Sequence, residues 1–164
     1  MKILVLYDSF FGNTKKVAQI IIDELKPQHE VSVAKAESAN IYQLQHLDLI
    51  FVGSPTRAFA PSPNMTAFLK MIPPQSLTGI KVAVFDTRIA PEDIKPKLIG
   101  FAIKLAGYAD KKIINLLKPS GGDVIQPSEG FLVSESEGPL KEGELTRAAT
   151  WAKSVISGIA TGNA

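Results

Sequence analysis

The chain has 164 residues, of which 45% are hydrophobic and 21% charged, and it contains no cysteine. This length suits one domain over residues 1–164, and the lack of thiols excludes disulfides, iron–sulfur clusters, thiolate zinc sites and a cysteine nucleophile. The 18 basic and 16 acidic residues leave a net charge of +2, which is too small to indicate nucleic-acid binding.

Short apolar runs alternate with segments of helical periodicity along the chain. The first run, residues 3–7, predicts a strand buried on both faces, and the helix after it ends at Pro27. No apolar run is long enough for a secretory signal or a membrane span, so we expect a cytoplasmic protein without membrane insertion. Further strands are predicted over residues 31–34, 47–53, 80–85, 113–117 and 131–133, and further helices around residues 65–72, 94–106 and 145–159.

This alternation predicts an α/β fold in which parallel strands are joined by right-handed crossovers, with helices on both faces of the sheet. Ligands of such folds bind at the carboxyl ends of strands, where the strand order reverses. We therefore expect function in the loops that follow Tyr7, Gly53 and Phe85. The long connection over residues 116–129 has two open roles, as a cover for a ligand or as a surface for a partner.

The loop after the first predicted strand is a candidate anion site. Ser9 and Thr14 supply hydroxyls, Asn13 an amide and Gly12 a flexible turn, directly before a helix start whose N–H groups favour an anion. No lysine lies in the loop, so the pattern suits a phosphate monoester held by hydrogen bonds. Helix capping by Asn13 and Thr14 is the alternative. The nucleoside-triphosphate loop and the dinucleotide fingerprint are both absent.

The stretch from Val5 to Thr14, which reads VLYDSFFGNT, resembles the flavodoxin signature. Residues 53–57 resemble the second flavin loop and, in the run Pro-Thr-Arg, the related quinone-reductase branch. The resemblance implies a flavodoxin-like three-layer sandwich with a five-stranded parallel sheet of order 2-1-3-4-5, and FMN as the cofactor. The cofactor-binding residues that it implies are Ser9, Phe10, Phe11, Gly12, Asn13, Thr14, Pro55, Thr56, Arg57, Phe59, Asp86, Thr87 and Arg88.

The flavin ring needs flat apolar cover, and the sequence leaves this cover partly open. Phe59 has two possible roles, stacking on the ring or covering the short helix that follows. Flavodoxins usually place a glycine-rich, acidic stretch with a tyrosine after the fourth strand. Residues 86–91 contain no glycine and no aromatic residue, so the second stacking partner is not identified.

Two arginines change the expected electrostatics of the ring site. If Arg57 and Arg88 both face the ring, they favour the negative charge of reduced flavin. We therefore predict a less negative potential for the fully reduced couple than in an acidic flavodoxin. The alternative is that either arginine pairs with Asp86 or Glu92.

Other polar residues do not form a competing site. His29 and His46 have no ligand-type neighbours at metal-binding spacing, so we expect no metal site. A receiver-like phosphotransfer site would need an acidic cluster beside Asp8, and a serine hydrolase would need a Gly-x-Ser-x-Gly elbow, which is absent. Trp151 is expected to pack in the last helix, and no acid or base catalyst is predicted.

Two functions fit this interpretation. The first is electron transfer to a redox partner protein, which the short length and the absence of a dimerisation insert favour. The alternative is a small FMN-dependent NAD(P)H:acceptor oxidoreductase that reduces a small-molecule acceptor such as a quinone. The Pro-Thr-Arg run and the basic charge balance favour this second function. A fold that has lost its flavin is a third possibility.

Overall fold

The predicted alternation of strands and helices is present in the computed structural model, which describes residues 1–94 and 107–162. Three short 3-10 turns, Ile41–Leu44, Pro91–Asp93 and Lys118–Ser120, connect the main elements. The main elements are β1 (Lys2–Tyr7), α1 (Asn13–Leu25), β2 (Glu30–Lys35), β3 (Leu49–Pro55), α2 (Pro63–Met71), β4 (Lys81–Ile89), α4 (Ala109–Leu117), β5 (Asp123–Val124), β6 (Glu129–Val133) and α5 (Glu144–Ala160).

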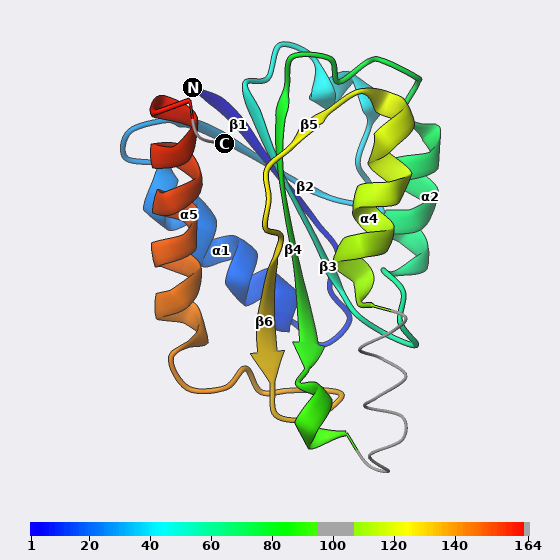
Figure 1. The fold of residues 1–164 in the computed structure, drawn as a ribbon, viewed down its shortest axis with the longest axis vertical. Helices are drawn as coiled ribbons and strands as arrows, with labels where there is room; N and C mark the ends of the chain where they lie inside the picture. Colours follow the sequence, from blue (N-terminus) through cyan, green and yellow to red (C-terminus); the bar gives the residue numbers. More distant parts are fainter. Residues whose placement is uncertain (95–106, 163–164) are drawn as a thin grey trace.

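All strands of the sheet pair in parallel, in the order β2-β1-β3-β4-β5, with β6 also paired to β4. This confirms the predicted order 2-1-3-4-5. Two short strands share the fifth position, because β5 pairs with the start of β4 and β6 with its end. Helices α1 and α5 cover one face and α2 and α4 the other, so the fold has three layers (Figure 1).

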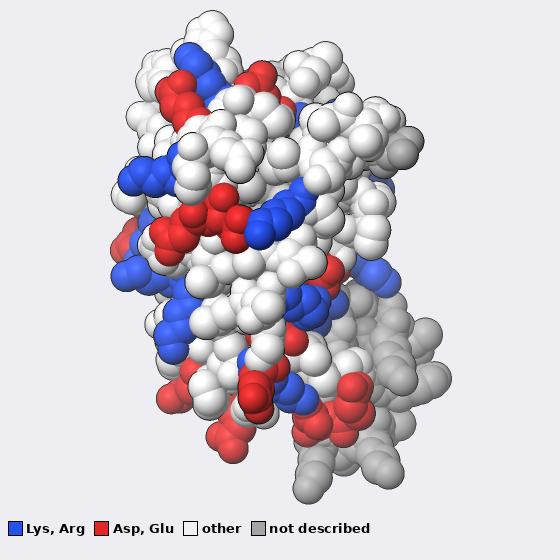
Figure 2. Space-filling model, turned by 90° about the vertical axis from the view of Figure 1, so that its left-hand side faces the viewer, with Lys and Arg blue, Asp and Glu red and all other residues white. Residues whose placement is uncertain are grey.

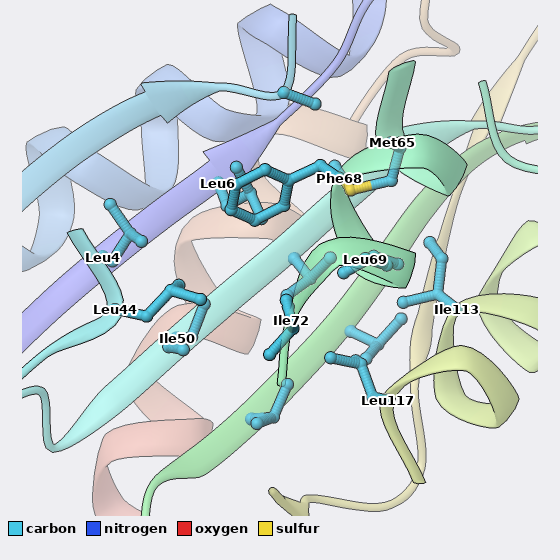
Figure 3. Close-up of a cluster of buried hydrophobic side chains, with 14 of the residues drawn as sticks. Leu4, Leu6, Leu44, Ile50, Met65, Phe68, Leu69, Ile72, Ile113 and Leu117 are labelled. Carbon is cyan, nitrogen blue, oxygen red and sulfur yellow. The ribbon is translucent and has the colours of Figure 1, made fainter. Parts of the chain in front are cut away.

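The prediction of a strand over residues 113–117 is wrong, because these residues belong to α4. Their apolar residues also fit a helical period: Ala109, Ile113 and Leu117 follow one another at intervals of four and are all buried in the same core cluster. Figure 3 shows Ile113 and Leu117 pointing together toward the side chains of α2. The helix predicted around residues 94–106 lies outside the described residues, apart from Ile94.

Two apolar clusters, one on each face of the sheet, hold the layers together. One cluster joins α2 and α4 to the sheet (Figure 3). In the other, the indole of Trp151 meets the rings of Phe51, Phe85 and Phe131 edge-on, at centroid distances of 5.4, 5.9 and 5.9 Å. Trp151 therefore anchors α5 on the sheet, as expected from the sequence.

Gly53 is required by a close contact between neighbouring strands. It pairs directly with Phe85, and a Cβ atom on it would lie 2.0 Å from the Cζ atom of that fully buried ring. We expect Gly53→Ala to lower the free energy of unfolding by about 2 kcal/mol through overpacking, as measured by urea denaturation. Trimming the ring in the double variant Gly53→Ala/Phe85→Leu should recover part of the loss, and strictly additive losses would contradict this explanation.

Candidate cofactor-binding site

Three segments meet at the carboxyl ends of β1, β3 and β4, at the end where the arrows of Figure 1 terminate. Strand pairing places Tyr7 beside Gly53 and Gly53 beside Phe85. Two backbone hydrogen bonds extend this alignment into the loops, since Asp8 N donates to Gly53 O at 3.0 Å and Thr56 N donates to Thr87 O at 2.8 Å. The three loops in which the sequence predicts function, after Tyr7, Gly53 and Phe85, are therefore neighbours in space.

Two adjoining cavities lie between these segments. The first is narrow, about 40 Å³, and is lined by Ser9, Phe10, Phe11, Asn13, Thr14, Pro55, Thr56, Arg57, Thr87, Arg88, Ile89, Val133 and Ser136. The second measures about 330 Å³ and is lined by Thr56, Arg57, Ala58, Phe59, Ile89, Ile94, Tyr108 and Ser136. Of the predicted site residues, ten line the first cavity and Phe59 lines the second, whereas Gly12 and Asp86 line neither.

The loop after β1 leaves the start of α1 without a side-chain cap. Gly12 occupies the N-cap position with a φ of 86°, a left-handed conformation that favours glycine. The Asn13 amide donates instead to the Glu137 carbonyl at 2.9 Å, and the Thr14 hydroxyl lies 2.8 Å from that of Thr87. Capping by Asn13 or Thr14 is therefore excluded, and the free N–H groups of the first turn can bind an anion.

Exposed aromatic and cationic side chains border the narrow cavity. The residues Phe10 and Phe11 are 46% and 43% exposed, and the Arg57 guanidinium lies over their rings at 5.2 and 5.5 Å from the centroids. Within residues 1–94 and 107–162, Arg57 forms no ion pair. A ligand site commonly measures roughly 300 Å³ or more, so the narrow cavity by itself is smaller than a typical ligand site.

Arg88, in contrast, is paired with two carboxylates. Its Nε donates to Asp86 Oδ1 at 2.5 Å, and its Nη2 forms an ion pair with Asp110 Oδ2 at 3.0 Å. The ring of Tyr108 covers the guanidinium at 4.1 Å. The alternative of pairing with Asp86 therefore holds for Arg88, whose charge is neutralised, and not for Arg57.

Asp86 lies beneath the cavities and is completely buried. Its Oδ2 accepts hydrogen bonds from the Thr56 hydroxyl at 2.9 Å and from the Asp110 backbone N–H at 3.2 Å. Burial raises the pKa of Asp86 to about 6, although the charge of Arg88 opposes the rise. Burial also acts to raise the pKa of Asp110, but the charge of Arg88 and the bond from Ser128 outweigh it and lower that pKa.

Both signs of charge are present around this end of the molecule. On the face covered by α1 and α5, basic and acidic side chains are intermixed, and acidic ones gather toward the carboxyl ends of the strands (Figure 2). The loop between β6 and α5 contributes the exposed residues Glu135, Glu137 and Glu142.

Among the described residues, no group of three acidic or histidine side chains is arranged to hold a metal ion. No helix in the described part of the chain is long and apolar enough to cross a membrane.

A family model for the flavodoxin domain matches residues 4–124. The chain belongs to the flavodoxin family. Members of this family are FMN-binding electron-transfer proteins. Three solved structures have the same fold as this chain at low sequence identity. Oxidised flavodoxin 1 from Bacillus cereus is 18% identical, with a TM-score of 0.72 over 96% of this chain and 98% of that one. Flavodoxin 2 from the same organism is 22% identical, with a TM-score of 0.71 over 96% and 99% of the two chains.

The third structure is a larger protein, rubredoxin oxygen:oxidoreductase from Desulfovibrio gigas. It is 18% identical, with a TM-score of 0.66, and the match covers 93% of this chain but only 34% of that one. A search of curated proteins finds no match. The flavodoxin fold is therefore established here by the family match and the structural likeness together.

The residues present in this flavodoxin fit FMN. The uncapped start of α1 and the tight turn at Gly12 suit the phosphate, because they present backbone N–H groups and no carboxylate side chain. The cavity of about 330 Å³ lies within the size range of ligand sites and has the aromatic residues Phe59 and Tyr108 in its lining. Such a lining suits a flat ring.

Tyr108 and Ser136 line the candidate site, and the sequence interpretation missed both. Tyr108 immediately precedes α4, and its hydroxyl donates to the Ile89 carbonyl at 3.2 Å. A correct helix prediction for residues 109–117 would have found it, because crossover helices start at the carboxyl edge of a parallel sheet. Ser136 lines both cavities from the loop after β6. No local pattern marks Ser136 in the sequence.

Proposed function

We propose that this flavodoxin binds FMN in the two adjoining cavities and transfers electrons to a redox partner protein. The uncapped start of α1, at the edge of cavities lined from three loops, is the observation that carries the proposal. FMN supplies the one- and two-electron chemistry when it is bound. The chain itself binds and orients the cofactor and sets the charge around it.

The lining of the two cavities and the start of α1 support the proposed role of each residue. Ser9, Phe11, Gly12, Asn13 and Thr14 surround the phosphate, with the backbone N–H groups of α1 as the main donors. Pro55, Thr56, Arg57 and Phe59 flank the ring on one side, Thr87 and Arg88 flank it on the other, and Tyr108 adds an aromatic wall.

FMN uptake tests the central claim. We expect the purified protein, once freed of cofactor, to quench the fluorescence of added FMN with a stoichiometry of one and to gain about 2.7 kcal/mol of stability at an FMN concentration of roughly 100 times Kd. Riboflavin, which lacks the phosphate, should bind at least roughly tenfold more weakly, because charge-assisted hydrogen bonds contribute about 1.5–3 kcal/mol. If neither flavin binds, or if both bind equally, the proposed phosphate site is wrong.

One observation favours the second candidate function, a small oxidoreductase. Arg57 is an exposed cation without an ion pair in the described part of the chain, at the rim of both cavities, where it would attract an anionic donor such as a nicotinamide nucleotide. A steady-state assay with NADH or NADPH and a quinone separates the two functions. Electron transfer predicts no turnover by the holoprotein alone, and sustained turnover would replace it with the second function.

A further inference from the structure

A buried carboxylate underlies the ring-side loop without reaching either cavity. Asp86 lies between three donors: Arg88 Nε on one oxygen, and the Thr56 hydroxyl and the Asp110 backbone N–H on the other. Buried charges are retained only where such partners compensate for lost solvation. The arrangement therefore joins the end of β4 to the loop after β3 and to the start of α4.

Thr56 connects the hydrogen-bonded groups around Asp86 to the cavities. Its side-chain oxygen donates to Asp86 and accepts from the Ala109 N–H at 2.9 Å, while its backbone N–H donates to the Thr87 carbonyl at 2.8 Å. Strand β4 and helix α4 thus both hold the side chain of Thr56, and Thr56 lines both cavities. A change at Asp86 would reach the site through Thr56.

We propose that Asp86 is the positioning residue of the FMN site, and that its ionised carboxylate holds Thr56 and Arg88 in the flavin-binding arrangement. An ionised carboxylate only accepts hydrogen bonds, which matches the three donors around it. Oδ2 already accepts two bonds, so a proton on it must reverse the Thr56 hydroxyl, and a proton on Oδ1 removes the negative charge that Arg88 Nε meets there. The remaining bonds would lose the charge that strengthens them. This inference rests on the proposed function, whose site it serves.

The groups around Asp86 make its charge sensitive to pH. Burial raises the pKa of Asp86 to about 6 despite the nearby charge of Arg88, whereas the pKa of Asp110 is lowered and this residue stays ionised. Tyr108 covers Arg88 and lies within reach of the charge of Glu92. Flavin binding needs the ordered loop that contains Thr56, and the ionised carboxylate of Asp86 holds this loop. By linkage, bound flavin must favour the ionised form of Asp86, and protonation of Asp86 in acid must weaken flavin binding.

Riboflavin binding measured against pH tests this inference. Riboflavin is the primary probe because a phosphate group, such as that of FMN, titrates near pH 6 and would obscure the titration of Asp86. We expect its Kd, measured by fluorescence quenching, to rise about tenfold between about pH 7.5 and pH 5, the equivalent of one pKa unit. Asp86→Asn should bind riboflavin weakly at every pH, because an amide can no longer accept from all three donors.

Two further variants make the outcome decisive. Thr56→Val keeps the buried carboxylate of Asp86 but deletes the hydrogen bond between Thr56 and that carboxylate. The riboflavin Kd of this variant should therefore depend less on pH than that of the wild type, and this result can be obtained even if Asp86→Asn folds poorly. Asp123→Asn, which removes an ion pair with Lys81 at the opposite end of β4, should behave as the wild type. A pH-independent Kd in the wild type, or the same pH profile in Asp86→Asn, overturns the inference. If neither FMN nor riboflavin binds at any pH, the proposed function itself fails.

Discussion

Replacing Arg57 with glutamate is expected to lower the potential of the couple that yields fully reduced FMN by about 120 mV. Reduced flavin carries negative charge, and Arg57 is a cation that borders both cavities without an ion pair in the described part of the chain. One pKa-like unit of differential stabilisation corresponds to about 60 mV for one electron, and the reversal of charge counts twice. A potentiometric titration of the holoprotein measures the shift.

Neutral replacement and a distant cation provide the controls for this shift. Arg57→Gln should move the potential by about half as much, roughly 60 mV. Lys26→Gln removes an exposed charge directly after α1, at the amino end of the sheet, and should leave the potential unchanged. Equal potentials for all three variants would show that Arg57 does not act on the ring.

The predicted less negative potential of the wild type now depends on Arg57 alone. Arg88 faces the narrow cavity, but Asp86 and Asp110 neutralise its charge. We therefore expect the potential to be raised by about half as much as two unpaired arginines would raise it.

The second large effect concerns stability and pH. We compare the free energy of unfolding of the wild type with that of Asp86→Asn at each pH. Relative to the variant, the wild-type value should fall by about 2.5 kcal/mol as the pH rises from about 4 to about 7. Burial raises the folded-state pKa of Asp86 to about 6, above its value in the unfolded chain. A group with a raised folded pKa contributes its stability at pH values below the unfolded pKa, and that contribution is lost as the pH rises through the folded pKa.

Urea denaturation of both proteins at several pH values measures this difference. Asp110 has a lowered pKa, so its own contribution is lost as the pH falls, but it is present in both proteins and cancels. A difference that is constant with pH would show that the three donors around Asp86 balance its burial, and a difference of the opposite sign would show that they outweigh it. Urea denaturation thus measures how much the buried charge of Asp86 lowers the stability of the whole fold. The riboflavin Kd measures separately how that charge affects flavin binding.

The strand-to-helix turn could be predicted from sequence because its signals are local. Gly12, Asn13 and Thr14 lie within a few residues of each other, between an apolar run and a periodic helix. The sheet order followed from the resemblance, and the alternation of elements supported it. Local reasoning failed at residues 113–117, where the run Ile-Ile-Asn-Leu-Leu suits either a strand or a helix.

The charge arrangement of the site needed the three-dimensional structure. Asp86 and Arg88 are close in sequence, but Asp110 reaches them only because α4 starts at the same edge of the sheet. The hydrogen bond from the Asn13 amide to the Glu137 carbonyl joins residues 124 positions apart. No short pattern encodes contacts of this kind, which arise from the packing of whole elements.

The packing of Trp151 against the sheet supplies an internal optical reporter. It is the only tryptophan of the chain, and its indole touches Phe85, the residue that directly precedes Asp86 on β4. Tryptophan emission overlaps flavin absorption, and a domain of this size has a radius of gyration of only roughly 15 Å, within the range of resonance energy transfer. Bound FMN should therefore quench the emission of Trp151, so cofactor occupancy and unfolding can both be followed without an attached label.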